Sequence, residues 1–459
     1  MKNSFKIPFL ALFIVFGIHL GFAIPKNIDP PLIKNVAPVA PTISATGNAN
    51  YCPLSQTKIV SSVTITHDPT ELTTEAVFIQ ISSGYVIGQD QLLLTNPLLH
   101  PTLTTSWNAL EGKLKLSSPT TGVQVNYSEF EAAIKDIVYT NSNPNPTGTR
   151  NFSITLGNGN ANYLPRNGHY YEYISDLGIT WSNAKTAAAN KTFYGLQGYL
   201  ATLTAADEAQ LAGKQAPGTG WIGGTDEGTE EVWKWVTGPE GQANGGSGTI
   251  FWNGLANGST PNFAFWNTNE PNQAGNEDYA HITAPGVGIA GSWNDLSNTG
   301  ATSGSYQPKG YIVEYGGMPG DPSLQLSAST SLTMAGKITA ANSNSNCGPG
   351  SVTLNATATF GTIEWYNSPT GGTPFTTGNN FATPSLTTTT NYYVSAGCAA
   401  DRTQITATIN PLPVVQNTSI TQCDTDATSD GKTTFNLTVN NDLISANYTN
   451  ETFKYFNSF

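Results

Sequence analysis

Oxygen-bearing side chains gather in two short segments of this sequence, and they define the chemistry that the chain could perform. The first segment carries Glu270 and Asn272, separated by one proline, with Glu277 seven residues after Glu270; the second segment is Asn294-Asp295. Calcium takes six to eight hard oxygen ligands, and carboxylates and amide carbonyls are its usual protein ligands. Three carboxylates overcompensate the charge of one divalent cation, so these residue types favour cation binding.

The same carboxylates suggest a second kind of chemistry, because paired acidic residues also cleave glycosides. Glu270 and Glu277 would be the acid/base pair of such a hydrolase. Cation binding already explains both residues, however, and no second cleft motif accompanies them. His169 and His281 stand apart from any nucleophile or metal-ligand spacing. We therefore expect no enzyme, and the glycoside hydrolase remains the less favoured alternative.

The segments around these residues predict a mixture of short strands and helices. Thr180 is a suitable N-cap for a helix whose apolar face is Trp181, Ala184 and Ala188. A second short helix is expected over 205–211. Strands are expected at 168–173, 198–203, 221–224 and 233–238.

Residues 163–316 resemble a C-type lectin-like domain. The resemblance is carried by the strand Trp221-Ile222-Gly223, by Tyr199-Leu200-Ala201-Thr202-Leu203 after the first helix, and by a group of motifs in the second half. That group comprises Trp266-Asn267-Thr268-Asn269-Glu270-Pro271-Asn272, Glu277-Asp278, Ser292-Trp293-Asn294-Asp295 and Gly310-Tyr311-Ile312-Val313-Glu314-Tyr315. The resemblance implies an α+β domain and a cis bond between Glu270 and Pro271.

The resemblance also implies a ligand. It makes one set of residues both the calcium ligands and the carbohydrate-binding residues: Glu270, Asn272, Glu277, Asn294 and Asp295. In the family, the order Glu-Pro-Asn accompanies mannose-type sugars, whereas Gln-Pro-Asp accompanies galactose. We therefore expect Ca²⁺-dependent binding of mannose-type glycans or glycoproteins. The alternative is a lectin-like domain that binds a protein ligand without sugar.

This sequence departs from the animal members of the family in its cysteines. Tyr279 and Val313 stand where disulfide-forming cysteines are usual, and no cysteine lies between Cys52 and Cys347. The long loop must then be held by packing, for which Trp252, Phe265 and Trp266 are candidates. Another group of tryptophans is expected in the core rather than on a sugar: Trp221, Trp233, Trp235 and Trp293.

The remainder of the chain predicts a mainly β, multidomain protein in which β-sandwich modules flank the lectin-like domain. We expect a linker at 24–49, a cadherin-like sandwich at 50–162, an Ig-like sandwich at 325–411 and an incomplete β module at 412–459. Cys347 and Cys398 bracket one β-rich part of the Ig-like segment, and a disulfide between them could staple it; unpaired buried thiols are the less favoured alternative.

Composition and the N-terminus indicate an exported protein. Charged residues make up 11% of the chain and the net charge is -12, which leaves no basic surface for nucleic acid. Lys2 and Lys6 precede an apolar run, and Gly21-Phe22-Ala23 provides a cleavage site, so 1–23 is predicted to be a signal peptide. We expect a secreted or cell-surface adhesin-like protein without a membrane span after signal removal.

Overall fold

The computed structural model describes residues 40–157, 161–424, 427–428 and 430–456. The predicted signal peptide at 1–23 lies outside these residues, as does most of the predicted linker. Among the described helices, none has both the length and the apolar character required to cross a membrane. The fold is mainly β and multidomain, which confirms the predicted fold class.

The first module, here called the first sandwich, is built around a six-stranded sheet. Its strands follow the order β2-β23-β12-β6-β9-β8, with bounds Asn48–Tyr51, Ser327–Met334, Thr149–Leu156, Ala76–Ser83, Lys113–Ser117 and Thr104–Asn108. Strand β9 alternates lysine with buried leucine, as expected where one face of a strand meets the core. Strand β6 is buried on both faces, which explains its nearly continuous apolar sequence.

Smaller sheets complete this sandwich. A three-stranded sheet has the order β3-β11-β7 (Thr57–Lys58, Ile137–Asn141 and Asp90–Leu94), and two strand pairs join β1 to β4 (Thr42–Thr46, Ser62–Thr66) and β5 to β10 (Thr73–Thr74, Val125–Asn126). Helix α1, Tyr127–Ile134, buries Phe130 and Ile134, and a 3-10 turn, η1, covers Pro97–Leu99.

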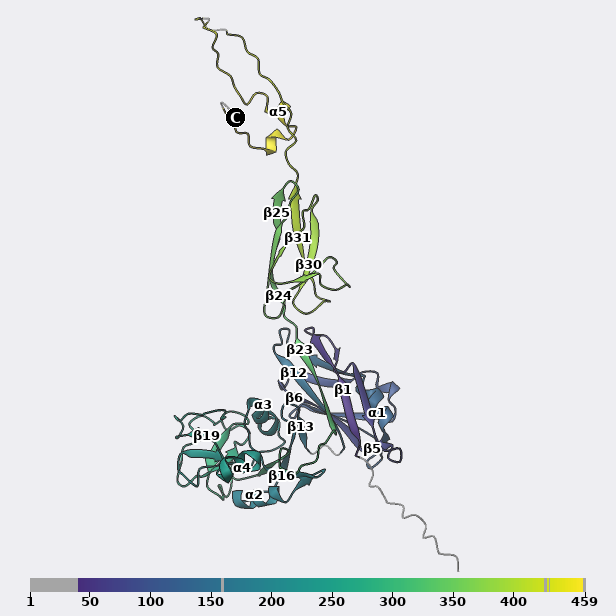
Figure 1. Cartoon of the computed structure of the whole chain (residues 1–459), viewed down its shortest axis with the longest axis vertical. Coiled ribbons are helices and arrows are strands. Elements are labelled where there is room, and N and C mark those ends of the chain that lie inside the picture. Colours follow the sequence, from purple (N-terminus) through teal and green to yellow (C-terminus); the bar gives the residue numbers. More distant parts are fainter. Residues whose placement is uncertain (1–39, 158–160, 425–426, 429, 457–459) are drawn as a thin grey trace, which may run out of the picture. The chain divides into compact units, whose positions relative to one another are not determined.

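Two of the predicted boundaries are wrong. Strand β1 lies inside the expected linker, where its alternating residues pair with β4. Strand β23 lies inside the segment assigned to the Ig-like module, yet it pairs antiparallel with β12, with Phe152 opposite Thr330 (Figure 1). The period-2 pattern of 327–334 marks a strand without specifying its partner. The first sandwich is therefore interrupted between β12 and β23 by a long insertion.

That insertion, β13 to β22, is called the inserted domain below. One sheet contains most of its strands in the order β13-β14-β22-β17-β18-β19. Their bounds are Asn162–Leu164, His169–Ser175, Gly310–Tyr315, Trp221–Thr225, Val232–Trp235 and Thr249–Asn253. Four further strands branch from this path: β15 (Thr192–Phe193), β16 (Leu196–Leu200), β20 (Tyr279–Ile282) and β21 (Trp293–Leu296).

The two helices that the sequence predicts in the inserted domain begin at, or within one residue of, the expected positions. Helix α2 spans Trp181–Ala189, and the Thr180 hydroxyl accepts a hydrogen bond from the Asn183 backbone N–H at 3.2 Å. Trp181, Ala184 and Ala188 are buried, as expected for the apolar face. The second short helix consists of α3 (Ala206–Glu208) and η2 (Ala209–Lys214), and α4 covers Gly238–Gly246.

Tryptophans dominate the core of the inserted domain. Trp221, Trp233, Trp235 and Trp293 are each at most 1% exposed, which confirms their predicted core role. Trp293 contacts Trp235 edge to face, with ring centroids 5.4 Å apart. Burial of four large aromatic side chains gives this disulfide-free domain much of its stabilisation.

The third module is a sandwich of one three-stranded sheet and one five-stranded sheet. The sheets follow the orders β24-β26-β29 (Ile338–Asn342, Thr353–Ala358, Asn380–Ala382) and β25-β31-β30-β27-β28 (Asn344–Cys347, Thr403–Asn410, Thr390–Ser395, Glu364–Tyr366, Thr376–Thr377). Trp365 is fully buried at its centre, as expected for an Ig-like sandwich. In the described part of 412–459 there is no strand, only α5 (Asn441–Ile444) and η3 (Tyr448–Asn450), so the expected β module is not seen there.

The predicted Cys347–Cys398 disulfide is wrong. Cys398 instead bonds Cys52 of the first sandwich, and Cys347 is free and exposed. The strand register explains this, because Cys347 lies opposite Asn410 at the end of β31 that is farther from Cys398. Beside the bridge, the Asn50 side chain donates a hydrogen bond to the Gly397 carbonyl at 3.0 Å.

Candidate functional site

The five residues predicted to bind a cation line one pocket of the inserted domain. The pocket has a volume of about 380 Å³. Its walls are Glu270, Asn272, Ala274, Glu277, Asn294, Asp295, Leu296, Ser297, Gly300, Ala301 and Tyr306. None of these residues is a lysine, arginine or histidine, so the carboxylates have no cationic side chain among the lining residues.

A strand and a loop bring the five residues together. Asn294 and Asp295 belong to β21, which is buried along its whole length and pairs with β20. The loop that carries Glu270 is fastened to the start of β21, because the Trp293 N–H donates to the Phe265 carbonyl at 2.8 Å and the Asn267 N–H donates to the Trp293 carbonyl at 2.7 Å. Trp293 therefore fixes both segments of the pocket.

Hydrogen bonds to Asp295 hold the loop that carries Glu270. Its carboxylate accepts hydrogen bonds from the backbone N–H groups of Asn272 and Gln273, at 3.0 and 2.8 Å. The Asn272 side-chain amide donates to the Glu270 carboxylate at 2.6 Å. The Glu270-Pro271 peptide bond is cis, as the family resemblance implies. Glu277 accepts from the Ala274 N–H at 2.9 Å, which holds the third carboxylate in the same wall.

Crowding of these carboxylates changes how they titrate. Burial, a hydrogen bond with Asp295 and the nearby charges of Asp295 and Glu277 raise the pKa of Glu270 to about 8. Burial and the charge of Asp295 also raise the pKa of Glu277. A bound cation would favour the ionised form of each group. The donor set thus fits a divalent cation chemically: oxygen ligands only, with excess negative charge.

Aromatic packing holds the loop in place of disulfides. Trp252, Phe265 and Trp266 are partly buried against the core of the inserted domain, which confirms the predicted contacts. Trp266 meets Trp233 edge to face with centroids 4.8 Å apart, and it lies 5.8 Å from Trp293. The loop that carries Glu270 is therefore anchored on the same tryptophans that form the core.

The structure also brings together a second acidic cluster that the sequence did not predict, formed by Asp226, Glu230 and Asp278. One carboxylate oxygen from each lies within 4.8 Å of the others. Asp226 and Asp278 are 4% and 5% exposed, and one oxygen of each has no hydrogen-bond partner among the described residues. Burial, with the charges of Glu230 and Asp278, raises the pKa of Asp226 to about 7. These oxygens could hold a second cation.

A sequence signal for this cluster was present. Asp226 and Glu230 are four residues apart, directly after the Trp221–Thr225 strand, and Asp278 follows a predicted ligand, Glu277. What the sequence could not supply was the pairing of β17 with β20, which brings Thr225 opposite Tyr279 and so places Asp226 beside Asp278.

Gln273 connects the acidic cluster to the pocket. Its backbone N–H donates to Asp295, and its side-chain amide donates to Glu230 at 2.5 Å. Its side-chain carbonyl accepts from the Glu277 N–H at 3.2 Å. The two groups of carboxylates therefore share one hydrogen-bonded loop.

His169 and His281 each make contacts that are typical of a structural histidine. His169 contacts Glu314 at 2.7 Å, and Glu314 also accepts from the Tyr171 hydroxyl at 3.0 Å. His281 is 1% exposed, packs edge to face on Trp221, and burial lowers its pKa to about 3. Neither histidine lines the pocket described above.

Comparisons with known proteins give three sequence or family matches. Residues 335–411 match the family model described as "Ig-like domain CHU_C associated". Halomucin of Haloquadratum walsbyi is 30% identical over 331 residues, which cover 68% of this chain and 3% of halomucin. Hepatic lectin of Gallus gallus is 35% identical over 77 residues, which cover 17% of this chain and 26% of that lectin. The chain thus spans only a small part of each relative's length.

Among solved structures, a calcium-independent type II antifreeze protein aligns with 35% of this chain and 93% of its own. The sequence identity is 16% and the TM-score is 0.23, a value too low to establish a shared fold. The family match is more specific, since it covers the sandwich of β24 to β31 from end to end. Residues 335–411 are therefore an Ig-like domain of the CHU_C-associated kind.

Proposed function

We propose that this chain is a secreted or surface-displayed adhesin-like protein that binds mannose-type sugars in a calcium-dependent way, through the pocket around Glu270 and Asp295. One observation carries the proposal. All five oxygen-bearing residues singled out in the sequence line a single pocket that contains no cationic side chain. The sequence similarity to a hepatic lectin supports a lectin activity.

The residues of the pocket have distinct roles in this proposal. Glu270, Asn272, Glu277, Asn294 and Asp295 hold Ca²⁺ through carboxylate and amide oxygens. When bound, the ion supplies coordination positions for two neighbouring sugar hydroxyls. The carboxylates accept hydrogen bonds from those hydroxyls, and the Asn272 and Asn294 amides donate to them. Asp295 also fixes the loop through the Asn272 and Gln273 N–H groups.

A second cation at Asp226, Glu230 and Asp278 would stabilise the same loop. It would satisfy the two buried carboxylate oxygens that have no partner among the described residues. Because Gln273 donates to Glu230, this cation would also steady the backbone that Asp295 binds. The chain would then take up two calcium ions, of which one contacts the sugar.

Binding, rather than catalysis, is the activity proposed. Glu270 and Glu277 both lie in the wall of the calcium pocket. A hydrolase would need one of them to stay protonated near the sugar as an acid. Bound calcium would instead keep both ionised.

Display outside the cell accords with several features of the chain. The Ig-like domain at 335–411 and the similarity of 68% of this chain to halomucin support this display. The disulfide between Cys52 and Cys398 suits an oxidising compartment. A net charge of -12 disfavours nucleic acid as a partner.

Calorimetric titration of the full chain with CaCl₂ tests the proposal. The wild type should bind calcium, and Asp295→Asn should weaken binding by at least tenfold, roughly the loss of one charged ligand in a partly buried site. Asp401→Asn, an exposed carboxylate of the Ig-like domain, is the matched control and should bind like the wild type. Absence of calcium binding to the wild type would refute the proposal.

A further inference from the structure

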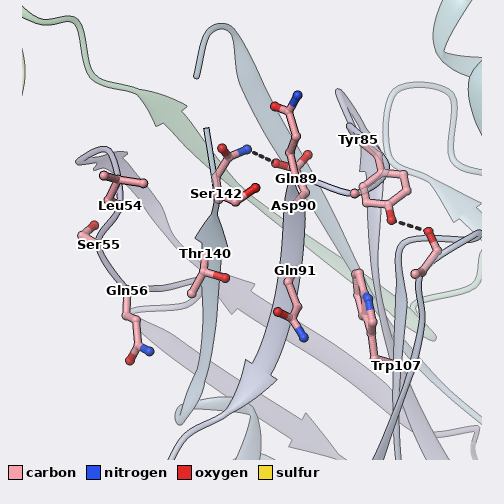
Figure 2. Close-up of a pocket in the computed structure, with 13 residues that line it drawn as sticks. Leu54, Ser55, Gln56, Tyr85, Gln89, Asp90, Gln91, Trp107, Thr140 and Ser142 are labelled. Carbon is pink, nitrogen blue, oxygen red and sulfur yellow. Dashed lines mark hydrogen bonds between the residues drawn. The ribbon is translucent and has the colours of Figure 1, made fainter. Parts of the chain in front are cut away.

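We propose that the first sandwich carries a second binding site, for a neutral glycan, which does not use a cation. The site is a pocket of about 470 Å³ between the β3-β11-β7 sheet and the loops around β8. It is lined by Leu54, Ser55, Gln56, Tyr85, Gly88, Gln89, Asp90, Gln91, Trp107, Ala109, Thr140, Asn141 and Ser142 (Figure 2). None of these residues belongs to the calcium pocket, so this inference does not depend on the function proposed above.

A row of uncharged polar side chains forms the floor of this pocket. In the register of β11 with β7, Thr140 lies directly opposite Gln91. On the other side, β11 pairs with β3 so that Tyr139 lies opposite Thr57, which brings Gln56 next to Thr140. Figure 2 shows the three side chains in the order Gln56, Thr140, Gln91 across the sheet. The strand register therefore spaces two amides and a hydroxyl across neighbouring strands.

These three side chains are available to a ligand. Gln56 and Gln91 are exposed, and Thr140 is half-buried. Within the described residues, no hydrogen bond involves the side chain of Gln56, Gln91 or Thr140, whereas Gln89 at the rim accepts from Asn143 at 3.3 Å. An amide offers both donors and an acceptor, and a hydroxyl offers one of each kind. This combination matches the hydroxyl groups of a sugar.

An aromatic side chain forms the end wall. Trp107 is half-buried, and its edge-to-face contact with Tyr85, at 6.3 Å between centroids, fixes its ring. Tyr85 is itself held, since its hydroxyl donates to the Ala109 carbonyl. Figure 2 shows the Trp107 ring beside Gln91. A fixed aromatic surface next to unpaired polar groups can take the apolar C–H face of a sugar ring while the amides bind its hydroxyls.

The charges of the pocket disfavour both anions and cations as ligands. Asp90 is the one ionisable acid or base that lines it, apart from the tyrosine, and it is 4% exposed. Its carboxylate is already paired: Arg150 Nε and the Val86 N–H each donate to it at 2.7 Å, and the Tyr139 hydroxyl donates at 2.5 Å. No free positive charge remains for a phosphate, and no free carboxylate remains for a cation. A neutral, hydroxyl-rich ligand fits the unpaired side chains of Gln56, Thr140 and Gln91.

The test uses the full chain on an array of neutral glycans, in the presence of a calcium chelator. We expect binding to a subset of glycans that survives both the chelator and Glu270→Gln. Gln56→Ala and Gln91→Ala should each weaken that binding roughly fivefold, the loss of about one net hydrogen bond. Gln404→Ala, an exposed strand glutamine of the Ig-like domain, is the matched control and should leave binding unchanged.

Trp107 provides a second measurement. Trp107→Ala should weaken chelator-resistant binding by about tenfold or more, whereas Trp107→Phe should retain most of it, because a phenyl ring still covers a sugar face. Since Trp107 also packs against the core, the two glutamine variants keep the test decisive if Trp107→Ala fails to fold. The inference is overturned if no glycan binds in chelator, or if both glutamine variants bind like the wild type.

Discussion

At the scale of the residue, Asp295 both holds the loop and affects the titration of Glu270. Its carboxylate accepts hydrogen bonds from two backbone N–H groups of the loop, and burial together with the hydrogen bond and charge of Asp295 raises the pKa of Glu270 to about 8. Without a cation, the protein therefore favours a proton on Glu270. In the proposed calcium site, the cation and that proton would compete for the same oxygens.

This competition predicts the pH dependence of calcium binding. The pKa of Glu270 is raised above its ordinary value of 4.5, so the folded, cation-free chain holds this proton more tightly than the unfolded chain does. Its contribution to stability therefore falls as pH rises from 4.5 towards 8. Calcium affinity should rise over the upper part of that window and level off above it.

Titration calorimetry at several pH values, in buffers of different ionisation enthalpy, would measure both the affinity and the protons released. Near neutral pH we expect proton release on calcium binding. An affinity that stays constant from about pH 6 to about pH 9 would contradict the coupling.

Exchanging the hydrogen-bond acceptor and donor at positions 270 and 272 should change the sugar specificity of the proposed site. The double variant Glu270→Gln with Asn272→Asp keeps the oxygen count and the net charge of the pocket but exchanges the positions of amide and carboxylate. It should lose mannose-type binding and gain galactose binding, because each hydroxyl would then meet the opposite hydrogen-bonding group. Competition with free mannose and galactose measures the change. Retained mannose preference would show that residues outside this pair set the specificity.

At the scale of the element, helix α2 and its cap show how far local sequence determines local structure. Thr180, Trp181, Ala184 and Ala188 predicted the start of the helix and its buried face, and the structure has both. Two strands likewise follow from their own residues, β9 from the alternation of lysine with leucine and β6 from a nearly continuous apolar run. Each of these elements depends only on residues within one or two helical turns or within one strand. The linear sequence is therefore enough to predict them.

Pairing between distant strands could not be predicted in this way. The alternation of 327–334 is the same whether the strand joins the first sandwich or the Ig-like domain, and its partner β12 is far away in the sequence. The cluster of Asp226, Glu230 and Asp278 was missed for the same reason. So was the polar row of Gln56, Thr140 and Gln91, which comes from three separate strands or their ends.

The cap of α2 offers a test at this scale. Thr180→Ala removes the acceptor for the Asn183 N–H and should lower the free energy of unfolding by about 1 kcal/mol. Thr186→Ala, in the middle of the same helix, is the control and should be neutral or slightly stabilising because alanine has the higher helix propensity. Urea denaturation measures both variants. Equal effects would mean that the cap contributes nothing specific.

At the scale of the whole molecule, the inserted domain and the disulfide determine how the modules are connected. The chain leaves the first sandwich after β12, forms the inserted domain, and returns to the same sheet as β23. Two connections to one sheet support the inserted domain at both of its ends. The bond between Cys52 and Cys398 adds a covalent link from the first sandwich to the Ig-like domain.

That link predicts a stability effect that the other cysteines should not share. Replacing both Cys52 and Cys398 with alanine should lower the free energy of unfolding by about 2–4 kcal/mol, because the bridge closes a long loop in the unfolded chain. Replacing Cys347 and Cys423, which are free and exposed, should have little effect. Denaturation under non-reducing conditions measures the difference, and peptide mapping identifies the bridge. Recovery of a Cys347–Cys398 peptide would contradict the structure.

The central claim, calcium-dependent sugar binding at the Glu270 to Asp295 pocket, is tested most directly by a glycan array probed with the full chain, with calcium and with a chelator. We predict signals on mannose-type glycans that vanish in chelator and are absent from the Asp295→Asn variant, while any glycan bound by the first sandwich keeps its signal. Mannose-type signals that persist unchanged in chelator and in Asp295→Asn would contradict the account.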